Sequence, residues 1–149
     1  MTQDEYYMSL ALSEARAAAA EGEVPIGAVV VGGGRILGRG HNQTERLSDV
    51  TAHAEMLAIS AAAQTLGGKY LPDCTLYVTV EPCPMCAGAI GWSQLQRIVI
   101  GAPDPKRGYS TLLRPGVTPF HPRAQVVEGV LEDECRTIMR DFFAARRFK

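Results

Sequence analysis

The sequence predicts an α/β protein with three layers, in which helices cover both faces of a central mixed sheet of about five strands. Short β-branched runs alternate along the chain with longer helical patterns. The segment 75–101 follows a strand–helix–strand pattern, and such a crossover is right-handed and joins two parallel strands. An apolar hairpin earlier in the chain adds antiparallel strands. A mixed sheet with a helical layer on each face follows from this order.

The first half of the chain is expected to form a helix, a hairpin and a second helix. Apolar residues recur on one face of residues 3–21, and Gly22 ends that run. Residues 26–31 and 35–40 are predicted to form two strands joined by the turn 32–34, which is three glycines. The second helix is expected over residues 51–66, before the glycine pair 67–68.

The second half is expected to add three strands and two helices. Thr75–Val80 (TLYVTV) is typical of a strand, and the helix 82–92 is predicted to start at Pro82, a favoured first-turn residue. A strand over 97–101 follows. Residues 102–123 hold five of the nine prolines and are expected to form a long loop. A last strand over 124–127 and a last helix over 131–143 complete the order.

Length and composition describe one ordinary globular domain, which we expect to span residues 1–149. The formal net charge of −1 argues against a grip on nucleic acid by the whole surface, although not by a local one. No apolar run approaches the ~20 residues of a membrane span. The acidic start MTQDEYYMSL is unlike a secretory signal. We therefore expect a cytosolic protein without membrane contact.

Two short motifs carry the chemistry. His53-Ala54-Glu55 lies at the start of the second predicted helix, and the run 82–86 (PCPMC) starts the third. Together they match the H-x-E and P-C-x-x-C pattern of zinc-dependent nucleobase deaminases. Residues three apart on a helix share a face, so Cys83 and Cys86 are able to aim both sulfurs at one point. The positive end of the helix dipole favours their thiolates, the form that binds metal.

With His53 as a third ligand, such a site holds Zn²⁺ and keeps one tetrahedral position for water, as catalytic zinc sites do. Zinc lowers the pKa of bound water from ~15.7 to ~7, which makes hydroxide available at neutral pH. Glu55 lies two residues from the proposed ligand and is suited to move the proton of that water to a ring nitrogen and then to the leaving amine. The predicted reaction is hydrolytic removal of an exocyclic amino group.

Structural zinc and redox chemistry are the alternatives for a C-x-x-C pair. Structural zinc needs a fourth protein ligand, for which the spare residues are Cys74, Cys135, His41 and His121. We expect Cys74 and Cys135 to pack instead as small apolar groups. A redox role would leave the histidine and glutamate of the first motif unexplained.

Most of the chain resembles the cytidine deaminase-like superfamily and, within it, the bacterial tRNA-specific adenosine deaminases. The zinc motif is specific for the superfamily, and other stretches favour the tRNA branch. The stretches that carry the resemblance are 22–31 (GEVPIGAVVV), 49–55 (DVTAHAE), 75–90 (TLYVTVEPCPMCAGAI), 101–106 (GAPDPK), 128–135 (EGVLEDEC) and 141–147 (DFFAARR).

The resemblance implies conversion of adenosine to inosine at the wobble position of a tRNA anticodon. It implies one zinc ion per chain on His53, Cys83 and Cys86, with Glu55 as the proton carrier. It also implies a homodimer that draws its surface for the anticodon stem-loop from both subunits.

The resemblance also implies where the substrate is held. Asn42 corresponds to an asparagine that contacts the flipped-out purine nucleoside, and Pro25 and its neighbours to a loop that lines the base pocket. Ala54 is expected to contact the substrate as well, and Asp104 and Lys106 correspond to a loop beside the bound RNA. After that loop the chain departs from the family: the run 107–110 is RGYS where many members have small residues, and the loop onward to residue 121 is shorter. We therefore do not infer from the resemblance that the loop after Lys106 contacts RNA.

The C-terminal end is the most basic part of the chain. Residues 136–149 hold five basic residues, Arg136, Arg140, Arg146, Arg147 and Lys149, against one acidic residue, Asp141. Such charges suit the phosphates of a stem-loop, and Phe143 or Phe148 would stack on a base or pack against the protein.

Two other functions compete with tRNA deamination. One is a free-base deaminase for guanine or cytosine, whose pocket would be closed by the chain's own C-terminus. The other is a non-enzymatic zinc module that binds RNA, which requires four protein ligands on the metal.

Overall fold

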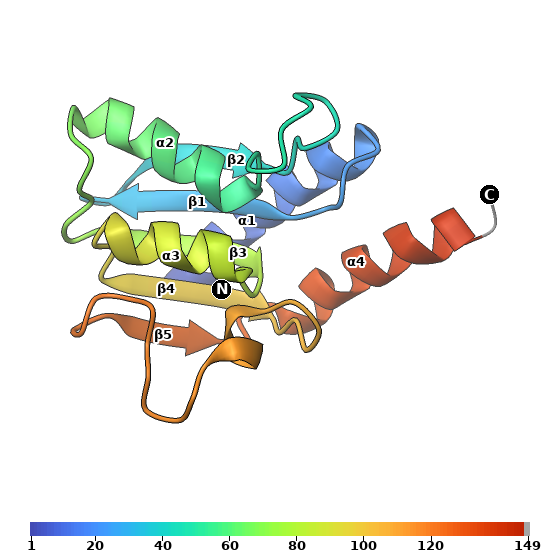
Figure 1. Ribbon diagram of the computed structural model, residues 1–149. Helices are drawn as coiled ribbons and strands as arrows, with labels where there is room; N and C mark the ends of the chain where they lie inside the picture. Colours follow the sequence, from blue (N-terminus) through green and yellow to red (C-terminus); the bar gives the residue numbers. More distant parts are fainter. Residues whose placement is uncertain (148–149) are drawn as a thin grey trace.

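The computed structural model describes residues 1–147, which form a five-stranded sheet between two layers of helices (Figure 1). The elements, in chain order, are α1 (Gln3–Ala20), β1 (Gly27–Gly32), β2 (Arg35–His41), α2 (Ala54–Leu66), β3 (Thr75–Val80), α3 (Pro84–Trp92), β4 (Arg97–Ala102), the 3₁₀ turn η1 (Tyr109–Leu112), β5 (Gln125–Glu128) and α4 (Glu132–Arg147).

The sheet is mixed, with the strand order β2-β1-β3-β4-β5. Strand β1 is antiparallel to β2 and β3, whereas β3, β4 and β5 run parallel to one another. The predicted fold class, the hairpin and the parallel pair at 75–101 are confirmed. Gly33 and Gly34 make the hairpin turn with φ of 60° and 75°, conformations that glycine adopts without a steric penalty.

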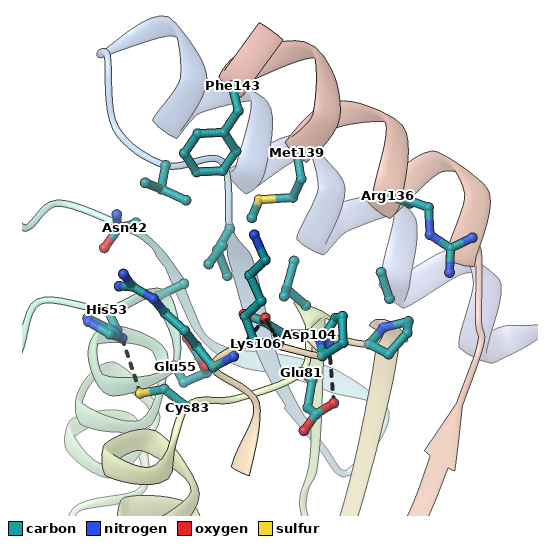
Figure 2. A pocket seen from close by; sticks show the side chains of 18 of the residues that line it. Asn42, His53, Glu55, Glu81, Cys83, Asp104, Lys106, Arg136, Met139 and Phe143 are labelled. Carbon is teal, nitrogen blue, oxygen red and sulfur yellow. Dashed lines mark hydrogen bonds between the residues drawn. The ribbon is translucent and has the colours of Figure 1, made fainter. Parts of the chain in front are cut away.

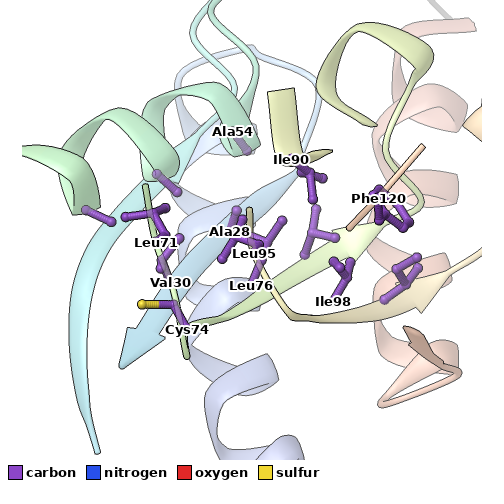
Figure 3. Close-up of a cluster of buried hydrophobic side chains, with 14 of the residues drawn as sticks. Ala28, Val30, Ala54, Leu71, Cys74, Leu76, Ile90, Leu95, Ile98 and Phe120 are labelled. Carbon is purple, nitrogen blue, oxygen red and sulfur yellow. The ribbon is translucent and has the colours of Figure 1, made fainter. Parts of the chain in front are cut away.

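Side chains alternate along the strands and build two cores. Ala28 and Val30 of β1 face α2 and α3, in the cluster that Figure 3 shows. Val29 and Val31 face the opposite layer, where α1 packs together with the first turns of α4. Because helices cover both faces of β1, its sequence is an unbroken apolar run.

Two glycines of β2 determine how closely α2 approaches the sheet. A Cβ at Gly38 or Gly40 would overlap the backbone of α2. The facing side of the helix carries only alanines, Ala54, Ala58 and Ala62, all fully buried. Helix α2 therefore lies directly on the strand, and its first turn, which carries His53 and Glu55, has a fixed position.

Several predicted boundaries were wrong by a few residues. Helix α2 begins at Ala54 and not at 51, because Thr51 is held in a turn by the Asp49 carboxylate. Helix α3 begins at Pro84, so Pro84 and not Pro82 is its first-turn proline. Helix α4 continues beyond 143 to Arg147. Among the described residues, no helix combines the length and the apolar character needed to cross a membrane.

Candidate active site

The two predicted metal-binding motifs meet beside the sheet. His53 and Cys83 are the N-cap residues of α2 and α3, and both have extended backbone conformations. Cys86 is in the first turn of α3. The Nδ1 atom of His53 lies 3.7 Å from Sγ of Cys83 and 3.4 Å from Sγ of Cys86. All three donor atoms lie within 4.8 Å of one another, close enough to bind a single ion.

The two thiols perturb each other strongly. The Cys86 side chain, by hydrogen bonding to Cys83, lowers the pKa of Cys83 to about 4, and the same interaction raises the pKa of Cys86. Hydrogen bonding to Cys83 also raises the pKa of His53. A second thiolate so close to the first is unfavourable unless a cation lies between them, and a metal ion is the group that lets both sulfurs ionise.

Glu55, in the first turn of α2, is buried next to this cluster. Its side chain is 3% exposed, and burial raises the pKa of its carboxyl group to about 7. Among the described residues, its Oε1 is the one buried side-chain oxygen or nitrogen atom without a hydrogen-bond partner. Buried polar atoms are almost always paired, so an unpaired oxygen here fits a site whose partner is a bound molecule.

A pocket of about 660 Å³ opens above the cluster (Figure 2). His53, Glu55 and Cys83 lie at its floor, whereas Cys86 is fully buried beneath them. Of the residues implied by the resemblance, Asn42, Ala54, Asp104 and Lys106 line the pocket. Pro25 does not. It is buried, and its neighbours Val24 and Ile26 form that part of the wall.

Several lining residues were not expected from the sequence. Thr44, Glu81 and Arg107 also line the pocket. Met139 of α4 also lines the pocket, beside Phe143, as Figure 2 shows. Glu81 had one signal in the sequence, because it is a charged residue between a buried strand and the first cysteine. Met139 had none, because its role depends on where α4 packs.

The spare cysteine and histidine residues lie elsewhere. Cys74 is buried in the core under α2 and α3, and Cys135 in the core under α1. His41 is bound between the carboxylates of Glu14 and Glu21, and His121 accepts a hydrogen bond from a backbone N–H. Among residues 1–147, only His53, Cys83 and Cys86 group as metal ligands, so the structure offers no fourth protein ligand there.

The basic end of the chain is partly engaged by the protein itself. Arg136, at the pocket, pairs with Glu132 one turn earlier, and Arg146 donates to the backbone oxygen of Gly22 and lies over the Phe142 ring. Phe143 is half-exposed at the pocket. Phe148 and Lys149, which the sequence also suggested for RNA contact, lie outside the described residues.

The fold, the His–Cys–Cys cluster and the buried glutamate define a zinc-dependent deaminase, and the chain belongs to this class. The cytidine and deoxycytidylate deaminase zinc-binding region matches residues 1–102. The chain is 50% identical over 151 residues to the tRNA-specific adenosine deaminase of Bacillus subtilis, covering 100% of this chain and 94% of that protein.

Two solved structures share the fold over nearly the whole chain. One, from a study of A-to-I editing by tRNA:A34 deaminases, has a TM-score of 0.80 and 44% identity, and the match covers 89% of this chain and 98% of that one. Guanine deaminase from Nitrosomonas europaea has a TM-score of 0.82 and 27% identity, with coverage of 97% and 86%. The backbone therefore does not separate the two activities, whereas sequence identity favours the first.

Proposed function

We propose that this protein is a hydrolytic deaminase that converts adenosine to inosine at the wobble position of a tRNA anticodon, with one zinc ion per chain. The observation that carries the proposal is the unpaired Oε1 of buried Glu55 beside three converging metal donors, at the floor of a pocket. The relative that is 50% identical to this chain is a tRNA-specific adenosine deaminase.

The donor set fits zinc, with His53, Cys83 and Cys86 as ligands. When bound, zinc supplies a water that ionises near neutral pH. Glu55 would take a proton from the attacking water, deliver it to the purine ring nitrogen and pass a second proton to the amino group, which leaves as ammonia when the C–N bond breaks. Its raised pKa, about 7, suits a group that both accepts and releases a proton near neutrality.

The walls of the pocket would hold the extruded base. Val24 and Ile26 offer apolar contact to its faces, and Asn42 offers an amide that both donates and accepts hydrogen bonds. A nucleotide in an anticodon loop is less costly to extrude than a paired one. Lys106 and Arg107, which also line the pocket, would meet the phosphates next to that nucleotide.

The test is incubation of the zinc-loaded protein with an anticodon stem-loop that carries adenosine at the wobble position, followed by nucleoside analysis. We expect inosine with the parent protein and none with Glu55→Ala. A stem-loop with the same adenosine placed in the paired stem is the matched control and is expected to stay unmodified. An unmodified wobble adenosine would overturn the proposal.

A free-base deaminase is the second candidate, because α4 brings Met139 and Phe143 to the pocket (Figure 2). A pocket closed by the chain's own C-terminal part suits a small ligand. The two candidates separate directly: parallel assays with free guanine and cytosine measure ammonia release. Turnover of a free base with no inosine in the stem-loop would favour this candidate.

We further propose that the protein acts as a homodimer that uses the outer surface of α3. Trp92, at the end of α3, is 84% exposed, and Met85 is exposed on the same helix. Leu112, in the 3₁₀ turn that contacts α3, is also exposed. Large exposed apolar side chains near one another are typical of interfaces. Trp92→Glu is expected to convert a dimer into a monomer in light scattering.

A further inference from the structure

The carboxylate of Glu81 accepts hydrogen bonds from the neighbouring loop. The loop comprises residues 104–110 and forms one wall of the pocket. Oε1 of Glu81 accepts the N–H of Asp104 at 3.2 Å. Oε2 accepts both the N–H and the hydroxyl of Ser110, at 3.0 and 2.7 Å. One side chain therefore holds both ends of the loop, and Figure 2 shows Glu81 beside the end at Asp104.

Between these two anchored ends the loop makes its own bonds. Oδ1 of Asp104 accepts the N–H groups of Lys106 and Arg107, at 3.1 and 3.0 Å. The N–H of Gly108 reaches the carbonyl oxygen of Asp104 at 2.9 Å, and that of Tyr109 reaches the carbonyl oxygen of Pro82 at 2.8 Å. The loop is thus hydrogen-bonded to the segment that precedes Cys83.

Gly108 shows how tightly this contact is packed. Its φ of −64° is available to any residue, yet an added Cβ would overlap the carboxylate of Glu81. The glycine is required by the contact and not by the backbone conformation. Lys106 and Arg107, which lie between the anchored ends, form no ion pair with an acidic side chain of residues 1–147. Their charges remain available to a ligand at the pocket.

We propose that Glu81 is a positioning residue: by holding the 104–110 loop, it places Lys106 and Arg107 where they meet the phosphates of the RNA. What the loop binds rests on the proposed function, whereas the anchoring itself does not. Glu81 acts on substrate affinity through the loop and leaves the chemistry at Glu55 unchanged.

The first test is the split between KM and kcat for the stem-loop in Glu81→Gln. Glutamine keeps the shape but offers one acceptor oxygen, so its NH₂ group faces a donor at one end of the loop. We expect KM to rise about tenfold with kcat within about twofold, the pattern of lost uniform binding. Gly108→Ala disturbs the same contact from the loop side, and we expect the same rise in KM at nearly constant kcat. Zinc content should match that of the parent protein.

The matched control is Glu128→Gln. Glu128 is exposed at the end of β5. Burial raises the pKa of Tyr109, and the charge of nearby Glu128 raises that pKa further. The side chain of Glu128 accepts no hydrogen bond within the described part of the chain. The substitution Glu128→Gln removes one negative charge near the same loop, as Glu81→Gln does, and is expected to leave KM unchanged. A fall in kcat at constant KM for Glu81→Gln, or an equal effect of the control, would overturn the proposal.

Hydrogen exchange tests the anchoring without any substrate. In Glu81→Gln the amides of Asp104 and Ser110 are expected to exchange about tenfold faster, while those of α2 keep their rates. Unchanged exchange in the loop overturns the inference whatever the enzyme acts on. If the parent protein fails to modify the stem-loop but the loop amides respond, the proposed function fails and the anchoring stands.

Discussion

The floor and the rim of the pocket are built by different means. The floor, in which we include the buried Cys86 beneath it, consists of His53, Glu55, Cys83 and Cys86, at the starts of two helices packed on the sheet. The rim consists of the loops 43–46 and 104–110 and the inner face of α4. Backbone packing fixes the floor, whereas single side chains hold much of the rim.

Two carboxylates illustrate how the rim is held. Glu23 is 2% exposed, and its two oxygens accept the N–H groups of Glu45 and Arg46, at 3.1 and 2.8 Å. Glu81 holds the opposite loop in the same manner. We therefore expect the two regions to fail separately: a change in the floor should remove the chemistry, and a change in the rim should alter what is bound. The predictions below test that separation, beginning with the largest effect.

Loss of one sulfur from the floor is expected to abolish activity through loss of the metal. Cys86→Ser replaces a thiolate ligand with a hydroxyl group, which binds zinc poorly. We expect zinc to fall from about one per chain to a small fraction of that, and deamination to fall below detection. Cys74→Ser is the control, because Cys74 is a buried cysteine outside the cluster. Cys74→Ser should keep its zinc. An equal loss of zinc in both variants would contradict the assignment of Cys86 as a metal ligand.

Glu55→Gln is expected to separate chemistry from metal binding. The amide cannot carry a proton, so the deamination rate should fall by about 10³-fold. Zinc content, measured by mass spectrometry of the metal, and the Kd for the stem-loop should stay near parental values, since neither depends on proton transfer. Retention of more than about a tenth of the parental rate would rule out Glu55 as the proton carrier.

The floor was predictable from the sequence because its residues are close together along the chain. His53 and Glu55 belong to one triplet, Cys83 and Cys86 to one C-x-x-C run, and each motif lies at the start of a helix. Neither His53 nor Cys83 caps its helix with a side-chain hydrogen bond. Residues that cap well usually occupy that position, so the structure shows two N-cap positions taken by a histidine and a cysteine that do not cap.

The rim was less predictable because its contacts span long distances in the sequence. Glu81 meets Ser110 across 29 residues, and Met139 reaches the pocket from the last helix. The resemblance indicated that Pro25 and its neighbours line the pocket, and the structure has the neighbours Val24 and Ile26, but not Pro25 itself, in the wall. The helix starts were also placed too early, since a proline or a threonine marks a helix start only to within a few residues.

Loss of a cation from the rim should weaken RNA binding without stopping catalysis. Lys106→Ala and Arg107→Ala are each expected to raise KM for the stem-loop several-fold, up to about tenfold, at constant kcat. Each phosphate contact releases counterions, so the dependence of log K on log salt should flatten by about one unit per residue. Salt titrations of binding measure this slope. Arg123→Ala, an exposed arginine outside the lining, is the control.

The smallest effect is expected at His41, which belongs to neither region. It ends β2 and binds Glu14 and Glu21 of the α1 end, at 3.1 and 2.9 Å. Burial lowers its pKa, but hydrogen bonds to these two carboxylates raise it by more, so the net pKa lies above 6.5. Arg39 and Arg46 approach the same carboxylates at 4.0 and 3.5 Å and compete with the histidine for them.

A raised pKa in the folded state means that protonated His41 stabilises the fold. This contribution is fully present below about pH 6.5 and is lost as the pH rises through the folded-state pKa. His41→Gln should therefore lower the free energy of unfolding by about 0.5–1 kcal/mol at pH 6 and leave it unchanged at pH 9. Urea titrations at the two pH values measure the difference. A deficit that is equal at both, or larger at pH 9, would show that packing of the ring and not its charge holds α1 to β2.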